Sequence, residues 1–245
     1  MVRYKRIISY LCITAVLFAS AGCSPSPAAK IDEKNLPDIS TVVIGPQLKT
    51  EPAGILVEEC AGAVIDYSST AEGFVMMEYA GCGGNDIKAQ VAGPETTYTY
   101  SLQNDKWAAF PLSEGDGEYT FTVFEDIGGG RYAMLVSVTA GVTLEDQFAP
   151  FIRPNQFVDY SDSPNAIAKA AQLADGTDDT LEIVGRVFTY VITSLTYDTE
   201  KAQTVKSGYL PVLEETLETG KGICFDYAAL MTGSSGLWAY RASLS

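Results

Sequence analysis

Histidine is absent from the whole 245-residue sequence. The imidazole of histidine is the side chain that most often accepts the proton of a cysteine or serine nucleophile, and it is also the commonest metal ligand. This chain therefore cannot assemble a Cys–His–Asp or Ser–His–Asp triad by itself. Because the five cysteines include no CxxC pair, the common zinc sites are excluded as well. We expect neither a metal nor a cofactor.

Basic residues are scarce. The chain has 16 Lys and Arg against 31 Asp and Glu, which gives a formal net charge of −15. Such an anionic surface repels the phosphate backbone of nucleic acids, so we do not expect DNA or RNA as a partner. The hydrophobic content of 47% is typical of a globular protein rather than a disordered one.

Long apolar runs are missing, with one exception near the start. The basic residues Arg3, Lys5 and Arg6 precede an apolar run over residues 7–19 that is too short to span a bilayer comfortably. A basic start, a short apolar stretch and small residues before a cleavage point are typical of a secretory signal. We therefore expect residues 1–22 to be a signal peptide.

The residues Ser20-Ala21-Gly22-Cys23 at the end of this segment resemble a bacterial lipobox. In a lipobox the cysteine receives a diacylglyceryl group and becomes the mature N-terminus, so Cys23 is the expected lipidation site. The alternative is an ordinary signal peptide with a chance cysteine. Residues 23–53 are rich in Pro, Ser and Ala, as tethers are, which favours the lipobox. The resemblance implies an extracytoplasmic protein with a lipid anchor in the cell membrane.

Residues 54–148 have the pattern of an all-β module. Short segments rich in β-branched and aromatic residues are separated by Gly-rich and Asp/Asn-rich breaks. The strand candidates are residues 55–57, 63–65, 74–77, 97–100, 119–124 and 132–138. Several short strands at close spacing favour an antiparallel sandwich, and we expect an immunoglobulin-like one. The aromatic residues Tyr98, Tyr100, Trp107 and Tyr119 could line a carbohydrate or peptide surface, but at strand spacing they predict cross-strand packing.

Residues 149–232 have a helical pattern. Ser163 before Pro164 is a helix start signal, and Asp179 with Glu182 resembles a capping box. Apolar residues then recur at helical spacing and predict a core-facing helix, in which we expect every one of them to pack. They are Leu181, Val184, Val187, Phe188, Val191, Ile192 and Leu195.

Cys60 and Cys82 lie in the β-module and leave two alternatives open. Outside the cytoplasm they could pair, and closing the loop between them would stabilise the fold by roughly 3 kcal/mol. They could equally remain two buried thiols that act as small hydrophobic side chains.

Cys224 follows Gly220 and Gly222 and precedes a run of good helix formers, which places its thiol at or near a helix N-terminus. Unpaired N–H groups and the helix dipole favour an anionic sulfur there, and a thiolate is the nucleophile of thiol acyl chemistry. A cysteine that merely fills a core is the alternative.

The residues around Cys224 favour the first interpretation. The run Gly220-Lys221-Gly222-Ile223-Cys224-Phe225-Asp226-Tyr227-Ala228-Ala229-Leu230-Met231 resembles the nucleophile motif of the transglutaminase-like superfamily. The segments Leu195-Thr196-Tyr197-Asp198 and Ser207-Gly208-Tyr209-Leu210-Pro211 resemble the same family. The resemblance implies an α+β chain in which a partial, papain-like helical half-domain over residues 149–232 follows the sandwich. It also implies that Cys224 attacks an amide carbonyl of a protein or cell-wall peptide and forms a thioester.

In that family a His and an Asp downstream complete the triad, and no residue here matches them. Asp226 is no substitute, because residues two apart on a helix do not face each other, and we interpret it as a first-turn acid. Gly233-Ser234-Ser235-Gly236 is expected to break the helix, so residues 233–245 are interpreted as an aberrant tail of a truncated domain. A naturally shortened, non-catalytic surface lipoprotein that binds a protein or cell-wall partner is the alternative.

Overall fold

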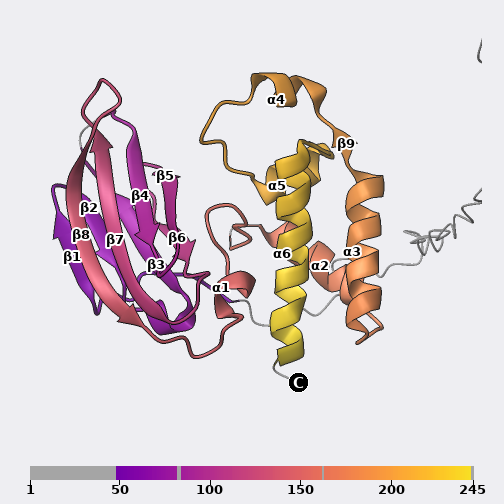
Figure 1. Cartoon of the computed structure of the whole chain (residues 1–245). Coiled ribbons are helices and arrows are strands. Elements are labelled where there is room, and N and C mark those ends of the chain that lie inside the picture. The colour runs from indigo at the N-terminus through magenta and orange to yellow at the C-terminus, as the bar shows by residue number, and fades with distance from the viewer. Residues whose placement is uncertain (1–47, 82–83, 162, 244–245) are drawn as a thin grey trace, which may run out of the picture.

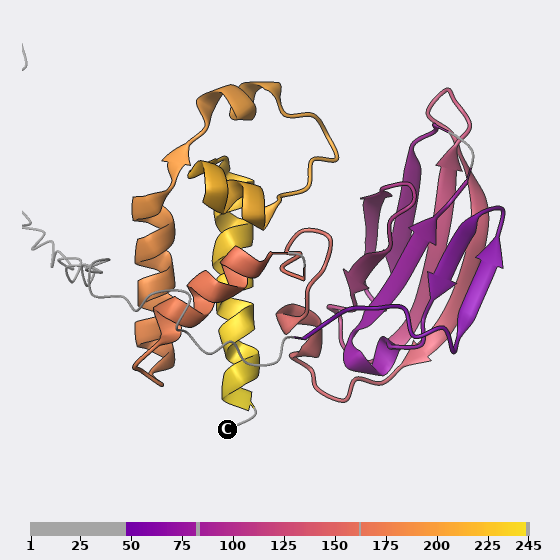
Figure 2. The same cartoon turned by 180° about the vertical axis from the view of Figure 1, so that it is seen from behind.

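The computed structural model describes residues 48–81, 84–161 and 163–243. The chain is α+β, with a β-module on one side and a group of helices on the other (Figure 1). Seen from behind, helix α1 and the segment that follows it lie between the two parts (Figure 2). No helix within these residues is both long and apolar enough to cross a membrane.

Two four-stranded antiparallel sheets form the β-module. The first has the order β1-β2-β3-β6, from Val57–Cys60, Ala63–Asp66, Phe74–Tyr79 and Ala108–Pro111. The second has the order β5-β4-β7-β8, from Thr97–Leu102, Ile87–Ala92, Gly117–Asp126 and Tyr132–Val142. A short 3-10 helix, η3, covers Thr70–Glu72.

Residues from both sheets share one hydrophobic core, so the two sheets face each other. Fully buried side chains include Ile65 and Phe110 from one sheet and Phe121 from the other. Tyr119 is also buried, and its hydroxyl donates to the Gly115 carbonyl at 3.0 Å. A buried phenol needs such a partner, because leaving the polar group unpaired costs stability.

The sequence pattern predicted six of the eight strands of this module and missed β4 and β6. In β4 the residues Ile87, Ala89 and Val91 are buried and alternate with Lys88 and Gln90. Lys, Gln and Ala are weak strand formers, so the alternation did not stand out. β6 has only four residues, and its pairing with β3 rather than its composition makes it a strand.

The second part of the chain holds six helices among the described residues. They are α1 (Ala149–Ile152), α2 (Pro164–Ala174), α3 (Thr180–Ser194), α4 (Thr199–Thr204), α5 (Leu213–Thr219) and α6 (Cys224–Ser243). A two-residue parallel pair joins β9 (Thr196–Tyr197) to β10 (Lys221–Gly222). Side chains of α2, α3, α5 and α6 form a second core.

The segment that connects the two parts is held to the β-module. Arg153 makes an ion pair with Glu72 at 2.8 Å and lies over the Phe74 ring at 5.3 Å from its centroid. Pro150 fills the space beside Gly73, where a Cβ would stand 2.7 Å from the proline ring. The connector therefore sits against one end of the first sheet.

Two sequence predictions on the helices are wrong. The Gly233–Gly236 segment does not break the helix, because α6 runs on to Ser243. A Cβ at Gly233 would meet Leu213 at 3.0 Å, so the glycine serves close packing, and tertiary contacts outweigh its low helix propensity. The start of α2 was predicted correctly, with Ser163 at the N-cap and Pro164 as the first helical residue, although the Ser163 side chain makes no capping hydrogen bond.

The second wrong prediction concerns α3, where only part of the apolar pattern packs. Val187 and Val191 are buried and Leu195 nearly so, whereas Leu181, Val184, Phe188 and Ile192 are exposed. The apolar arc of α3 is wider than the contact that its neighbours α2 and α6 offer. Its start was predicted well, since the Asp179 carboxylate accepts from Leu181 N at 2.9 Å.

Candidate functional site

Cys224 is the first residue of α6, and its side chain is exposed. The chain reaches it through a tight reversal. Gly220 ends α5 in the left-handed conformation with φ 61°, and the β9–β10 pair then fixes the direction of the backbone. The sequence therefore placed this cysteine correctly at a helix N-terminus.

The buried side chain of Asp226 stabilises this helix N-terminus. Its carboxylate is fully buried and accepts from the backbone N–H of Ile223 at 2.8 Å. Ile223 is the residue just before the helix, so Asp226 closes the start of α6 as the third residue of a capping box does. Burying a charge also requires further partners, and two side chains supply them.

Those partners come from separate segments of the chain. The Tyr209 hydroxyl donates to Asp226 Oδ1, and Lys201 Nζ lies 3.2 Å from Asp226 Oδ2. Lys201 also lies over the Tyr209 ring, 4.5 Å from its centroid. α4 and the loop before α5 are therefore held to the start of α6 by one polar cluster of Asp226, Tyr209 and Lys201. Asp226 is a first-turn acid of α6, as predicted, and the structure adds its contacts with Tyr209 and Lys201.

The cluster changes the pKa values of both partners. Burial would lower the pKa of Lys201, but hydrogen bonds to Tyr209 and Asp226 and the negative charge of Asp226 outweigh it and raise that pKa. Burial and the hydrogen bond to Asp226 raise the pKa of Tyr209. At neutral pH the cluster therefore holds a protonated lysine and a neutral phenol.

A row of aromatic rings connects this site with the β-module. Phe225, next to Cys224, lies 6.4 Å from Tyr209 and 5.7 Å from Phe157 between ring centroids. Phe157 lies 5.8 Å from Tyr100, which in turn lies 4.9 Å from the buried Phe110. The Asn155 side chain fixes Phe157 by accepting its backbone N–H at 2.9 Å. The start of α6 is thereby packed, through these rings, against the core of the β-module.

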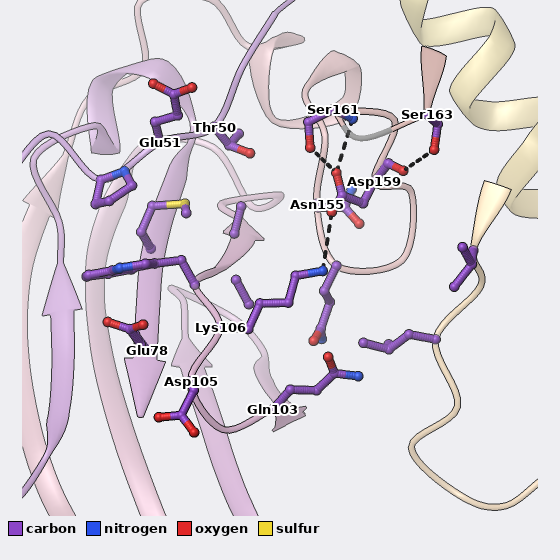
Figure 3. Close-up of a pocket in the computed structure, with 18 of the residues that line it drawn as sticks. Thr50, Glu51, Glu78, Gln103, Asp105, Lys106, Asn155, Asp159, Ser161 and Ser163 are labelled. Atoms are coloured by element: carbon purple, nitrogen blue, oxygen red, sulfur yellow. Dashed lines mark hydrogen bonds and ion pairs between the residues drawn. The ribbon is translucent and has the colours of Figure 1, made fainter. Parts of the chain in front are cut away.

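A groove of about 530 Å³ lies between the two parts of the chain. Its lining comes from the segment before β1, from β3 and the β5–β6 region, from the connector and from the loop before α5 (Figure 3). Trp107 is one of its lining residues, while Tyr119 is a core residue and Tyr100 belongs to the aromatic row. Of the four aromatic residues considered in the sequence, Trp107 alone lines this groove, and Tyr98 is exposed on β5.

The other predicted site residues are spread apart. Cys60 ends β1 and is exposed, on the opposite edge of its sheet from β6. Cys23 and Cys82 lie outside the described residues, so lipidation and pairing stay predictions. Sequence reasoning missed the roles of Lys201 and Tyr209. Tyr209 stands in a motif that resembled the family, which was the only signal available, and nothing singled out Lys201.

Residues 167–234 match the family model of the transglutaminase-like superfamily. This part of the chain belongs to that superfamily. The match begins in α2 and includes Cys224, Asp226 and the first half of α6, as well as Gly233, which the sequence analysis assigned to an aberrant tail.

The other comparisons add little to the superfamily assignment. No match was found among curated protein sequences. A solved structure of a beta-1,2-glucanase from Parabacteroides distasonis is 11% identical to this chain, with a TM-score of 0.28. The similarity covers 78% of this chain but only 35% of the glucanase. A similarity at this level carries no argument about fold or activity.

Proposed function

We propose that this transglutaminase-like domain carries out thiol acyl chemistry on an amide, with Cys224 as the nucleophile. The observation that supports it best is the exposed Cys224 side chain on the first residue of a long helix, inside the region that matches the superfamily. The Cys224 sulfur would attack the amide carbonyl, the C–N bond would break, and the amine would leave with a proton. Water or an amine would then release the acyl group from the thioester.

The reaction needs a base to accept the thiol proton, and the 245 residues offer no histidine for it. Asp226 is committed to Ile223, Tyr209 and Lys201 and stays buried, so it positions the helix rather than moving that proton. We therefore propose that this chain alone holds the nucleophile and its support but does not turn over. The helices α2–α6 would then be the helical half of a papain-like domain.

Thiol labelling tests whether Cys224 serves as a nucleophile. The whole chain is treated briefly with iodoacetamide near neutral pH, and labelled peptides are quantified by mass spectrometry. With the chain kept reduced so that Cys60 is a free thiol, we expect Cys224 to be modified faster than Cys60, which is also exposed but ends a β-strand. A Cys224→Ser chain controls for labelling elsewhere. If Cys224 reacts no faster than Cys60, the proposed role as a nucleophile is wrong.

We propose further that the β-module is immunoglobulin-like. The sheet orders β1-β2-β3-β6 and β5-β4-β7-β8 support it. Without the edge strand β1, three strands face four, as in that architecture, and β1 is then an additional strand beside β2. Tyr119 near the start of β7, with its hydroxyl bonded to Gly115 four residues upstream, resembles the tyrosine corner of such domains.

The location proposed for the protein rests on the sequence alone. We propose that Cys23 carries the lipid and that the module and helices lie outside the cytoplasm, joined to the lipid by residues 23–53. Metabolic labelling with a palmitate analogue tests this in a bacterial host. The label should appear on the chain and disappear in a Cys23→Ser variant, and label that survives the substitution would exclude Cys23 as the lipidation site.

A second candidate function is binding without catalysis, as a surface lipoprotein that holds a protein or cell-wall partner. The groove between the β-module and the helices favours it, because ligand sites tend to lie at domain boundaries in cavities of this size. Both functions are compatible with one molecule, since the groove and Cys224 are separate features.

A further inference from the structure

Each sheet of the β-module has two edge strands, and both edges of the first sheet are protected from pairing with another chain. β1 is a short strand that carries Glu58 and Glu59, and charged side chains on an edge discourage a further strand. β6 ends at Pro111. The connector also approaches β6, since Gln156 N donates to the Ala109 carbonyl at 3.4 Å.

In the second sheet, the edge strand β5 lies against the helical part of the chain. The Tyr100 ring of β5 is 5.8 Å from that of Phe157 in the connector. In the loop before α5, a Cβ added at Gly208 would lie 3.5 Å from Ser101 Oγ. The edge at β5 is therefore contacted by other segments of the same chain.

The remaining edge strand, β8, has none of these protections. Its 11 residues include no charged residue and no proline. Its backbone hydrogen bonds run to β7, and within residues 48–81, 84–161 and 163–243 none runs to another segment. The register shift in β7 between Val123 and Phe124 lies near the start of β8 and leaves residues 136–142 in regular pairing. Alternate N–H and C=O groups of these residues therefore point away from the sheet, ready to pair with another strand.

Large apolar side chains are exposed at both ends of this edge. β1 lies beside β8 on the open side of the sandwich, with Cα atoms within 8 Å. Just before β1, Ile55 is 80% exposed and donates its N–H to Ser68 Oγ at 3.0 Å. β8 finishes at this same end, because Glu145 N donates to the Ala71 carbonyl at 2.9 Å. At the other end, near the start of β8, Met134 is 63% exposed, so each end offers apolar surface to a partner.

Two charged side chains of opposite sign flank the strand. Arg131 directly precedes β8, Glu145 follows it, and both are exposed. Neither side chain makes an ion pair or a hydrogen bond with another residue that the structure describes. Each stands seven residues from Val138 along the chain. A strand with a base at one end and an acid at the other is complementary to an antiparallel copy of itself.

We propose that β8 is the interface of a homodimer in which two copies of this strand pair antiparallel about a two-fold axis near Val138. The two four-stranded sheets then form one continuous sheet. Arg131 lies toward the partner's Glu145, and Met134 lies toward the partner's Ile55. The two-fold axis repeats each of these contacts.

The overall charge of the chain argues for this edge over other surfaces. Each copy has a formal net charge of −15, so two copies repel each other at most approaches. The uncharged β8, with its complementary ends, lets the two chains come into contact with the least repulsion. An acidic partner that lacks this self-complementary pattern would not gain the same contacts.

The proposed interface leaves the candidate site free. β8 lies on the side of the β-module that faces away from the helices (Figures 1 and 2). Cys224, at the start of α6, therefore stays exposed in both copies. The dimer does not depend on the thiol chemistry, and failure of one proposal leaves the other intact.

Sedimentation equilibrium tests the dimer. The sample is residues 23–245, the mature chain expected from the sequence, with Cys23→Ser and with reductant present, so that neither a lipid nor an intermolecular disulfide causes association. Between about 1 and 100 µM we expect a reversible monomer–dimer equilibrium and no larger species, because a two-fold interface closes. A chain that stays monomeric, or one that forms open-ended oligomers, would overturn the proposal. Slow hydrogen exchange of the β8 amides in a monomer would assign the edge to a segment of the same chain instead.

A matched pair of variants locates the interface. Thr139→Lys adds like charges on either side of the axis and removes one exposed hydroxyl contact, with Thr120 at 2.8 Å. It should weaken the dimer about tenfold or more. Thr99→Lys on β5 adds the same charge and removes a similar contact, with Gln90 at 3.3 Å, and should leave the dimer unchanged. Melting curves confirm that both variants fold. Equal effects of the two substitutions would exclude β8 as the interface.

A charge exchange tests the antiparallel register. Arg131→Glu places two acids together at each end of the paired strands and should weaken the dimer about threefold or more. Adding Glu145→Arg to that chain restores a pair of opposite charges and should recover the original affinity. If the double variant dimerises no better than Arg131→Glu alone, the proposed pairing about Val138 is wrong.

Discussion

The carboxylate of Asp226 lies directly against Gly222. A Cβ added at Gly222 would stand 2.6 Å from the Asp226 Cβ and 3.1 Å from its Oδ2. The same Oδ2 accepts from Ile223 N, so this close approach forms the turn that delivers Cys224 to the start of α6. The glycine is needed here for space, because its φ is not in the left-handed range.

Replacing that glycine should therefore disturb the candidate site. We expect Gly222→Ala to lower the free energy of unfolding by about 1–3 kcal/mol, as overpacking does in other cores, and to slow labelling of Cys224. Urea unfolding and the iodoacetamide assay measure the two effects. Gly185→Ala is the matched control. A Cβ at Gly185 in α3 meets nothing within 4 Å, so this substitution should be neutral or stabilising by up to about 1 kcal/mol.

The polar cluster around Asp226 predicts a loss of stability in alkali. The pKa values of Lys201 and Tyr209 are raised above their ordinary values of 10.5 and 10.0. In both cases the folded chain holds a proton that the unfolded chain gives up at lower pH. The stabilisation is therefore complete below about pH 10 and is lost as pH rises through the folded-state values. Urea midpoints between pH 7 and 11 should fall steeply above pH 10.

Tyr209→Phe identifies the source of that loss. It keeps the ring against Phe225 and removes the hydroxyl that Asp226 accepts, so it should cost about 1–2 kcal/mol at pH 7 and make the decline above pH 10 shallower. Tyr98→Phe, at an exposed strand position, should leave stability at neutral pH unchanged. An undiminished decline in Tyr209→Phe would assign the alkaline loss to other groups.

Of the two alternatives that the sequence leaves open for Cys60 and Cys82, we propose that they pair in the oxidised protein, although Cys60 is an exposed free thiol in the structure. Contacts between Gly62 and the residues just before Cys82 favour this proposal. Ala80 N donates to the Gly62 carbonyl at 2.8 Å, and a Cβ at Gly62 would lie 3.1 Å from the Gly81 Cα. Peptide mapping without reductant should find the linked pair. Reduction should cost roughly 3 kcal/mol, and Cys60→Ser should abolish that sensitivity. Two alkylatable thiols in the oxidised protein would contradict the pairing.

The proposed chemistry predicts that Cys224 reacts with an alkylating reagent but that the chain does not turn over a substrate. The whole chain should be alkylated at Cys224, yet it should release no ammonia from a glutamine-containing dipeptide, because no histidine can take the proton. Ammonia release is followed by a coupled assay, with Cys224→Ala as the blank. Turnover that Cys224→Ala abolishes would show that another group in this chain acts as the base.

The sequence predicted the elements better than the contacts between them. Local signals were sufficient for α3, which begins at Asp179, and for α6, which begins at Cys224. They were insufficient for β6 and for the helix beyond Gly233, where pairing and close packing with distant residues decide the structure. Lys201 and Tyr209 could not be joined to Asp226 in advance, because only the folded chain brings residues so far apart in sequence together.

The aromatic row described above has a consequence for how the molecule melts. Phe110 belongs to the core of the β-module, and Phe225 belongs to the helix that begins at Cys224, with Tyr100 and Phe157 in contact between them. Neither part can open at this boundary without exposing rings of the other to water, so the boundary favours cooperative unfolding. We therefore expect the sandwich and the helical group, which could each have been independent, to share a single thermal transition.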